Sequence, residues 1–140
     1  MESLMEMGQQ VLKQQAFSTL MGTRLVHLTK GEVVLELPLR EELRQQYGFV
    51  HGGVLSYMAD NALTFAGGTA MTGPVITSEF KINYVRPAQG SMLIARARAL
   101  HAGRRQSVCH CEIFVVTEKG ETLVAVAQGT IAAMAPREES

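Results

Sequence analysis

The sequence predicts an α+β fold in which a six-stranded antiparallel sheet wraps around one long central helix. A long proline-free run, residues 51–68, repeats apolar residues at helical spacing on most of its sides, so the helix is expected to be buried. Four strand-like stretches separated by turn residues follow this run, and two shorter ones precede it. The sheet covers one side of the helix, so its other side and the sheet edges need a partner.

The composition places the chain among globular proteins. Its 140 residues fit one domain, residues 1–140, that is long enough to bury a core. A hydrophobic content of 46% with 19% charged residues predicts a somewhat apolar surface, which suits an oligomer. The formal net charge is zero, so we expect no bulk attraction to nucleic acid or to a membrane. No apolar run approaches the roughly 18 residues of a membrane span. The acidic N-terminus does not resemble a signal peptide, and we expect a cytoplasmic protein.

The first third of the chain predicts a short N-terminal helix and a hairpin. Apolar residues recur at helical spacing through residues 1–16, which predicts a short amphipathic helix. The stretch 17–22 is expected to be irregular. Residues 23–30 and 33–39 alternate as strands, and the Lys30–Glu32 turn between them predicts a hairpin.

The rest of the chain predicts the central helix and four strands. Residues 40–50 form a connector with room for one short turn of helix. The helix is expected to stop at Gly67 and Gly68, with a loop over 69–74. The tail, 136–140, is polar and expected to be frayed. The four strands are predicted at residues 75–86, 91–102, 106–117 and 122–134.

Two cysteines, Cys109 and Cys111, flank His110. On a strand both thiols point to one face and the histidine to the other. A metal site needs more ligands nearby than this segment supplies, so the cysteines are interpreted as buried reduced thiols. We therefore expect no metal and no cofactor.

One acid, Asp60, lies in the middle of the apolar helix. A buried carboxylate costs several kcal/mol or more unless it is paired. Asp60 is therefore expected to be exposed at a cleft or to take part in a reaction. At the helix start, Gly52 and Gly53 allow close approach to unpaired N–H groups that favour an oxyanion. Gly53 and Asp60 are about 10 Å apart along the axis, too far to touch one reacting carbon. Two copies of the chain would have to share such a site. A plain turn before an ordinary helix is the alternative.

Three motifs occur in order along the chain: His51-Gly52-Gly53, then Met58–Ala62 with its acid nine residues after the histidine, then Lys81–Ala88 with its Arg-Pro-Ala end. From about Phe17 to Met134 the chain thereby resembles the hotdog-fold acyl-CoA thioesterases. This group includes the phenylacetate-degradation (PaaI-like) and 4-hydroxybenzoyl-CoA thioesterases. The resemblance implies a hotdog fold and hydrolysis of an acyl-CoA thioester.

The resemblance also implies catalytic roles. The family's acid, a nucleophile or general base, falls on Asp60. The N–H that polarises the carbonyl falls on Gly52, and the histidine that orients the loop and the thioester falls on His51. In this family the acid and the glycine come from different subunits of a dimer, and dimers often pair into tetramers. A homodimer is thus the expected minimum, and a homotetramer the expected assembly.

Two further polar residues follow from the same resemblance. A polar amide six residues before the histidine falls on Gln45, although the residues alone favour a Gln45 side chain that faces water. The hydroxyl that positions water falls on Thr77, with Ser78 as the neighbour if the register is shifted by one.

Candidate substrate contacts combine the helix start, the neighbouring apolar residues and nearby cations. Coenzyme A carries phosphates, so arginines are expected near its entry. The predicted binding residues are Gly53, Phe49, Tyr57, Arg86 and Arg104. The strand at 75–86 is predicted to pair edge to edge with its copy. The alternatives are a non-catalytic acyl-CoA binding module on the same fold, a dehydratase of that fold and a purely structural oligomer.

Overall fold

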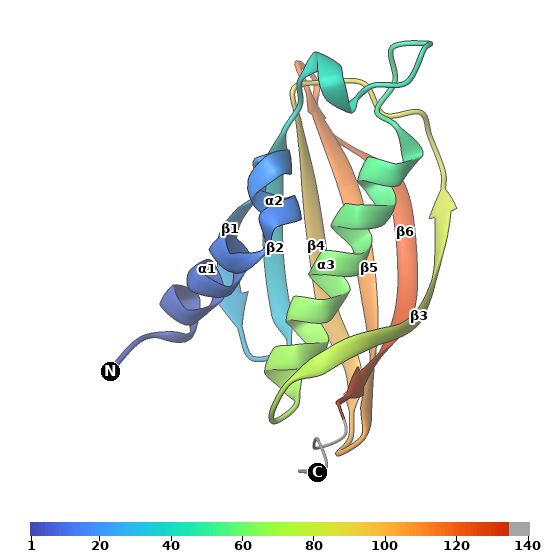
Figure 1. The fold of residues 1–140 in the computed structure, drawn as a ribbon. Coiled ribbons are helices and arrows are strands. Elements are labelled where there is room, and N and C mark those ends of the chain that lie inside the picture. Colours follow the sequence, from blue (N-terminus) through green and yellow to red (C-terminus); the bar gives the residue numbers. More distant parts are fainter. Residues whose placement is uncertain (135–140) are drawn as a thin grey trace.

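The computed structural model describes residues 1–134 and shows a six-stranded antiparallel sheet curved around one long helix, α3 (Figure 1). The strands run in the order β1-β2-β4-β5-β6-β3. The predicted hotdog architecture is confirmed, and the predicted frayed tail, 136–140, lies outside the described residues. The helices are α1 (Leu4–Gln14), α2 (Ala16–Met21), the short 3₁₀ helix η1 (Glu41–Leu43) and α3 (Gly52–Ala70). The strands are β1 (Arg24–Thr29), β2 (Glu32–Pro38), β3 (Val75–Tyr84), β4 (Met92–Ala102), β5 (Gln106–Thr117) and β6 (Gly120–Ala133).

The core lies between α3 and the concave face of the sheet. Met58 and Leu63 of α3 are fully buried, and they meet fully buried strand residues such as Leu35, Leu93 and Ile113. Each such side chain contributes about 1.5–3 kcal/mol relative to exposure. This burial holds α3 rigidly and so fixes the positions of the polar residues that it carries.

The predicted end of the central helix is wrong. The helix runs through Gly67 and Gly68 to Ala70. Gly67 is a packing residue, because a Cβ atom there would lie 2.5 Å from Ser107 Oγ and 2.7 Å from Ile131 Cβ. The sheet touches the helix backbone at this point, and a side chain does not fit.

The predicted irregular stretch at 17–22 is also wrong, because it forms most of α2. Ser18 is 1% exposed, and its hydroxyl donates to Gln15 Oε1 and contacts the Tyr57 hydroxyl, both at 2.6 Å. Gly22 ends the helix in the left-handed conformation, at φ 87°. Contacts with α3 stabilise a helix too short for local periodicity to reveal. The N-terminal helix, α1, is correspondingly shorter than predicted and begins after the N-cap Ser3.

Strand β3 lies at one edge of the sheet and crosses beside α3 (Figure 1). Its register against β6 shifts between Thr77 and Glu79, which marks a bulge. Phe80 and Ile82 are half-buried, as their alternation with Lys81 predicts. Within residues 1–134, no helix combines the length and apolar character needed to cross a membrane.

Candidate active site

The start of α3 presents one backbone donor that the chain does not use. His51 is the N-cap, and its Nδ1 accepts a hydrogen bond of 2.8 Å from the Gly53 N–H. The Gly52 N–H has no hydrogen-bond partner among residues 1–134. It lies at the positive end of the helix dipole, where negative charge is stabilised. The histidine thus occupies one glycine N–H and leaves the other able to receive an oxygen atom.

A cavity of about 360 Å³ opens at this glycine. Three residues predicted from the sequence, Gln45, Phe49 and Arg86, line it together with Gly52. Gln45 is half-buried rather than turned to water, and its side-chain oxygen accepts from the Tyr47 N–H. The Arg86 guanidinium donates to the Leu123 carbonyl at 2.9 Å. The cavity therefore has a polar amide, an aromatic ring and a cation around one free N–H.

Tyr84 forms a wall of this cavity that the sequence reasoning did not assign. Its hydroxyl donates to the Gly52 carbonyl at 3.1 Å and contacts Ser56 Oγ at 2.8 Å. A Cβ atom at Gly52 would lie 3.5 Å from the tyrosine ring. The tyrosine therefore holds the first turn of α3 from the strand side. It stands in the third motif, but nothing in the sequence pattern shows that it reaches the helix start.

The Asp60 carboxylate lines a different cavity, of about 430 Å³. Its Oδ1 accepts a hydrogen bond of 2.6 Å from the hydroxyl of Thr77, the residue that the resemblance assigns to positioning water, and Ser78 is exposed. Its Oδ2 has no hydrogen-bond partner, and no cation forms an ion pair with it, among residues 1–134. One oxygen is held and the other is free, an arrangement suited to a base or a nucleophile.

Thr64 is a second hydroxyl beside the carboxylate that the sequence reasoning missed. Its Oγ1 donates to the Asp60 carbonyl at 2.8 Å and lies 2.9 Å from Thr77 Oγ1. The available signal was the spacing: residues four apart on a helix are neighbours on one face. Thr64 therefore links α3 to β3 beside the acid.

Tyr57 lies in the Asp60 cavity, away from Phe49. Its hydroxyl is engaged by Ser18 Oγ at 2.6 Å and by Thr23 Oγ1 at 2.7 Å. Its ring packs edge-on against Phe17 with 5.0 Å between centroids. The tyrosine therefore forms a braced wall of the cavity.

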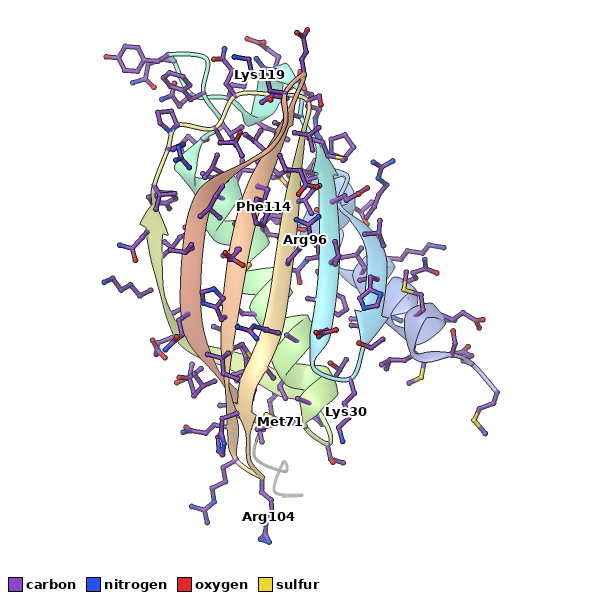
Figure 2. All side chains as sticks on the ribbon, turned by 180° about the vertical axis from the view of Figure 1, so that it is seen from behind. Lys30, Met71, Arg96, Arg104, Phe114 and Lys119 are labelled. Carbon is purple, nitrogen blue, oxygen red and sulfur yellow. The ribbon has the colours of Figure 1, made fainter. Side chains whose placement is uncertain are left out.

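The two cavities share no lining residue. Gly52 and Asp60 are eight residues apart on one straight helix, about 12 Å along its axis. Arg104 lies in the β4–β5 turn at the end of the sheet where α3 finishes near Met71, and Lys119 marks the opposite end (Figure 2). Within one chain, Asp60 therefore lies with Thr77 and Tyr57. Gly52 lies with Gln45, Phe49 and Arg86. Arg104 lies away from both groups.

The cysteines take no part in either cavity. Both are free and buried, and burial raises the pKa of the Cys109 thiol and raises the pKa of Cys111 to about 12. At neutral pH neither is a thiolate, so neither is a nucleophile. Residues 1–134 contain no group of three or more His, Cys, Asp or Glu side chains placed to hold a metal ion.

Comparisons with known proteins place the chain in a family. The model of the thioesterase superfamily matches residues 47–122, more than half of the chain. A 1,4-dihydroxy-2-naphthoyl-CoA hydrolase from Listeria monocytogenes serotype 1/2a (strain 10403S) is 28% identical over 113 residues, 79% of this chain and 89% of the relative.

Solved structures show the same likeness. A thioesterase family protein from Silicibacter pomeroyi superposes with a TM-score of 0.85 at 29% identity, covering 89% of this chain and 93% of that one. A mutant of the phenylacetic acid degradation protein PaaI from Thermus thermophilus gives a TM-score of 0.75 at 30% identity, covering 84% and 98%. The chain therefore belongs to the thioesterase superfamily and is a thioester hydrolase.

Proposed function

We propose that the protein hydrolyses acyl-CoA thioesters in a site that two copies share, with Asp60 from one copy and the Gly52 N–H from the other. The observation that carries the proposal is the separation of these two groups into different cavities of one chain. A thioester carbonyl is far too small to span about 12 Å, so one helix cannot supply both groups to it. The Listeria relative is named as the hydrolase of a CoA thioester, which supports this substrate class.

The two groups divide the chemistry between them. The thioester carbonyl oxygen accepts a hydrogen bond from the Gly52 N–H, which stabilises the negative charge of the tetrahedral intermediate. One such donor is worth about 2.7–4 kcal/mol. Asp60 Oδ2, the unpartnered oxygen, acts on the other side of the carbonyl carbon. Thr77 holds the carboxylate by its hydrogen bond to Oδ1, and Thr64 contacts the Thr77 hydroxyl. His51 keeps the Gly53 N–H from competing for the oxygen.

Two routes conserve atoms and charge. In the first, Asp60 Oδ2 bonds to the carbonyl carbon, the C–S bond breaks, CoA thiolate leaves and water hydrolyses the anhydride. In the second, Asp60 takes a proton from water and the hydroxide adds to the carbonyl carbon; the C–S bond then breaks, and the departing thiolate receives that proton from the Asp60 carboxyl group. In a single turnover in heavy-oxygen water, label in the Asp60 carboxylate requires the first route, with water attacking the Asp60 carbon of the anhydride. Label in the product acid alone is produced by the second route and also by attack of water on the acyl carbon of the anhydride.

Strand β3 and Arg86 supply the remaining parts of the proposal. Because β3 is an edge strand, it can pair with its copy across a two-fold axis and bring two α3 helices together. Arg86, at the Gly52 cavity, is the proposed contact for the CoA phosphates. Arg104 is left out of the proposed site, because it lies at the other end of the sheet (Figure 2).

A mixed dimer tests the shared site directly. Asp60→Asn removes the acid and keeps the shape. Gly52→Pro replaces the N–H by a ring carbon and is compatible with the helix, because proline is tolerated at the first helical position and His51, at φ −60° and ψ 136°, has the conformation that precedes proline. Each variant alone should lose most of its release of free thiol from acyl-CoA. Co-expressed under two tags and purified as the mixed dimer, the pair should regain about half of the normal turnover, because one of its two sites is intact.

The controls separate the possible failures. Gly52→Ala keeps the N–H, and its Cβ would meet the Tyr84 ring at an ordinary 3.5 Å, so it should stay active. A mixed dimer as inactive as its parents refutes the shared site. Full turnover by Asp60→Asn refutes the role of the acid. An unmodified protein that binds acyl-CoA and never releases thiol would instead be a binding module.

A further inference from the structure

A larger cavity, of about 550 Å³, continues from the Asp60 cavity. The two share four lining residues, Gln15, Asn61, Thr64 and Val75. From there the larger cavity follows α3 to Gly68 and the loop before β3, with α1 as its outer wall. Figure 1 shows α1 on one side of α3 and β3 on the other. The carboxylate thus stands at the mouth of a groove that runs for roughly 12 Å along α3.

The polarity of this groove changes along its length. The shared end carries the amides of Gln15 and Asn61 and the Thr64 hydroxyl, and no charged side chain lines any part of the groove. At the far end the Thr69 hydroxyl donates to the Phe65 carbonyl at 2.8 Å and accepts from the Gly31 N–H at 2.9 Å, so it is satisfied internally. The walls between are apolar and include Leu4, Met7, Val11, Leu28 and Phe65.

Three exposed apolar side chains of α1 indicate that the groove favours an apolar ligand. Leu4, Met7 and Val11 lie on one face of the helix and remain 38%, 50% and 48% exposed, although they flank the groove. The opposite face of α1 carries the polar residues Gln9 and Lys13. An apolar ligand in the groove would remove these three side chains from water, which is favourable.

We propose that this groove holds the acyl chain of the substrate, and that the substrate class is an unbranched, unsubstituted fatty acyl thioester. The inference rests on the proposed function and deepens it. The thioester lies at the polar mouth beside Asp60, and the alkyl chain runs under α1 towards Gly68. A hydroxylated aryl group would be disfavoured, since the inner walls leave its hydroxyl without a partner and an unpaired buried hydroxyl is costly. The volume lies in the range of about 300–1,000 Å³ usual for small-molecule sites.

The proposal is tested by a substitution in α1, the outer wall, that narrows the groove. Val11→Trp places an indole in the groove, and Gln9→Trp places the same ring on the opposite face of α1. The readouts are kcat/KM for lauroyl-CoA and butyryl-CoA, and the Kd values of the non-hydrolysable thioethers S-dodecyl-CoA and S-butyl-CoA. One fully buried methylene corresponds to about a fourfold preference. The unmodified protein should therefore favour the twelve-carbon ligand at least tenfold in both ratios.

The variants then give opposite results. Val11→Trp should lower both preferences at least fivefold, and Gln9→Trp should leave them within twofold. If Val11→Trp shows no cooperative thermal unfolding transition, and so is not folded, Met7→Trp serves as the second variant that narrows the groove. The acyl groove is overturned if Val11→Trp lowers kcat/KM and affinity equally for both chain lengths, or if it leaves the chain-length preference unchanged. It is also overturned if the unmodified protein prefers a hydroxylated aroyl-CoA over lauroyl-CoA. Absence of turnover on every thioester overturns the proposed function instead, and the thioether Kd ratio then decides the groove separately.

Discussion

Replacing Thr77 by valine removes the hydroxyl that donates to Asp60 Oδ1 at 2.6 Å and contacts Thr64 Oγ1 at 2.9 Å, and it keeps a side chain of similar shape. A hydrogen bond to a charged group contributes about 1.5–3 kcal/mol. Asp60 and Thr77 are half-buried at a cavity, where water can replace the hydroxyl, so the lower value of about 1.5 kcal/mol applies. At about 2–4 °C per kcal/mol, the Tm should fall by about 3–6 °C.

The same substitution should reduce catalysis more than stability. Without the Thr77 hydroxyl the carboxylate can rotate about its side-chain bonds, and a misplaced reacting group costs up to about 100-fold in rate. We expect kcat for acyl-CoA hydrolysis to fall about 10- to 100-fold with little change in KM, measured by free-thiol release. Thr77→Ser should recover most of kcat, and Ser78→Ala, at the exposed neighbour, should change nothing. If Thr77→Val keeps both its kcat and its Tm, the hydroxyl neither holds nor positions Asp60, and the reasoning fails.

Further predictions concern packing and the buried thiols. Gly67→Ala should destabilise the fold by about 1–3 kcal/mol in urea unfolding, because its Cβ would lie within 2.7 Å of Ile131. Gly68→Ala, whose Cβ would meet only a Val75 methyl group at 3.1 Å, should be neutral or gain up to about 1 kcal/mol from helix propensity; equal effects of the two would contradict this packing. Raising the pH above 9.0, the ordinary pKa of the thiol, should lower the free energy of unfolding, because Cys111 ionises near pH 9 in the unfolded state and only near pH 12 in the folded state. The loss is about 1.4 kcal/mol per pH unit for this thiol, and a Cys111→Ala variant should lack it. A thiol reagent should find neither cysteine in the folded protein and both after unfolding, and rapid labelling of the folded protein would show that the thiols are accessible.

The sequence predicts the elements whose pattern repeats over many residues. The central helix and the four later strands are long, and their apolar periods match their burial, so they are found within a few residues of their ends. The errors lie where contacts with distant residues decide the local conformation. The sequence around Gly67 resembles a helix stop, but the glycine is required there because the sheet packs against the helix backbone. Ser18 stabilises α2 as a helix through its hydroxyl contact with Tyr57, 39 residues away.

The bulge in β3 shows why only part of the site is predictable. Strict alternation places Thr77 with Glu79 on the wet face, opposite Phe80 and Ile82. The register shift between Thr77 and Glu79 turns Thr77 back towards α3, where it meets Asp60. Periodicity cannot reveal an inserted residue, so only the family resemblance identified Thr77. The groove beneath α1 is unpredictable for a related reason, since it depends on how α1 packs beside α3.

The order of the strands has a consequence for the newly synthesised chain. Strand β3 follows α3 directly in the sequence, but its only neighbour in the sheet of the described residues is β6, with Val75 opposite Ala133 and Tyr84 opposite Ala125. During translation, β3 therefore emerges long before the strand that pairs with it. Pairings between distant segments form slowly, because the intervening loop must first be closed. The hydroxyl that holds Asp60 can reach its place only once β6 has been synthesised, so a nascent chain cut short before β6 would carry the acid without the strand that positions it.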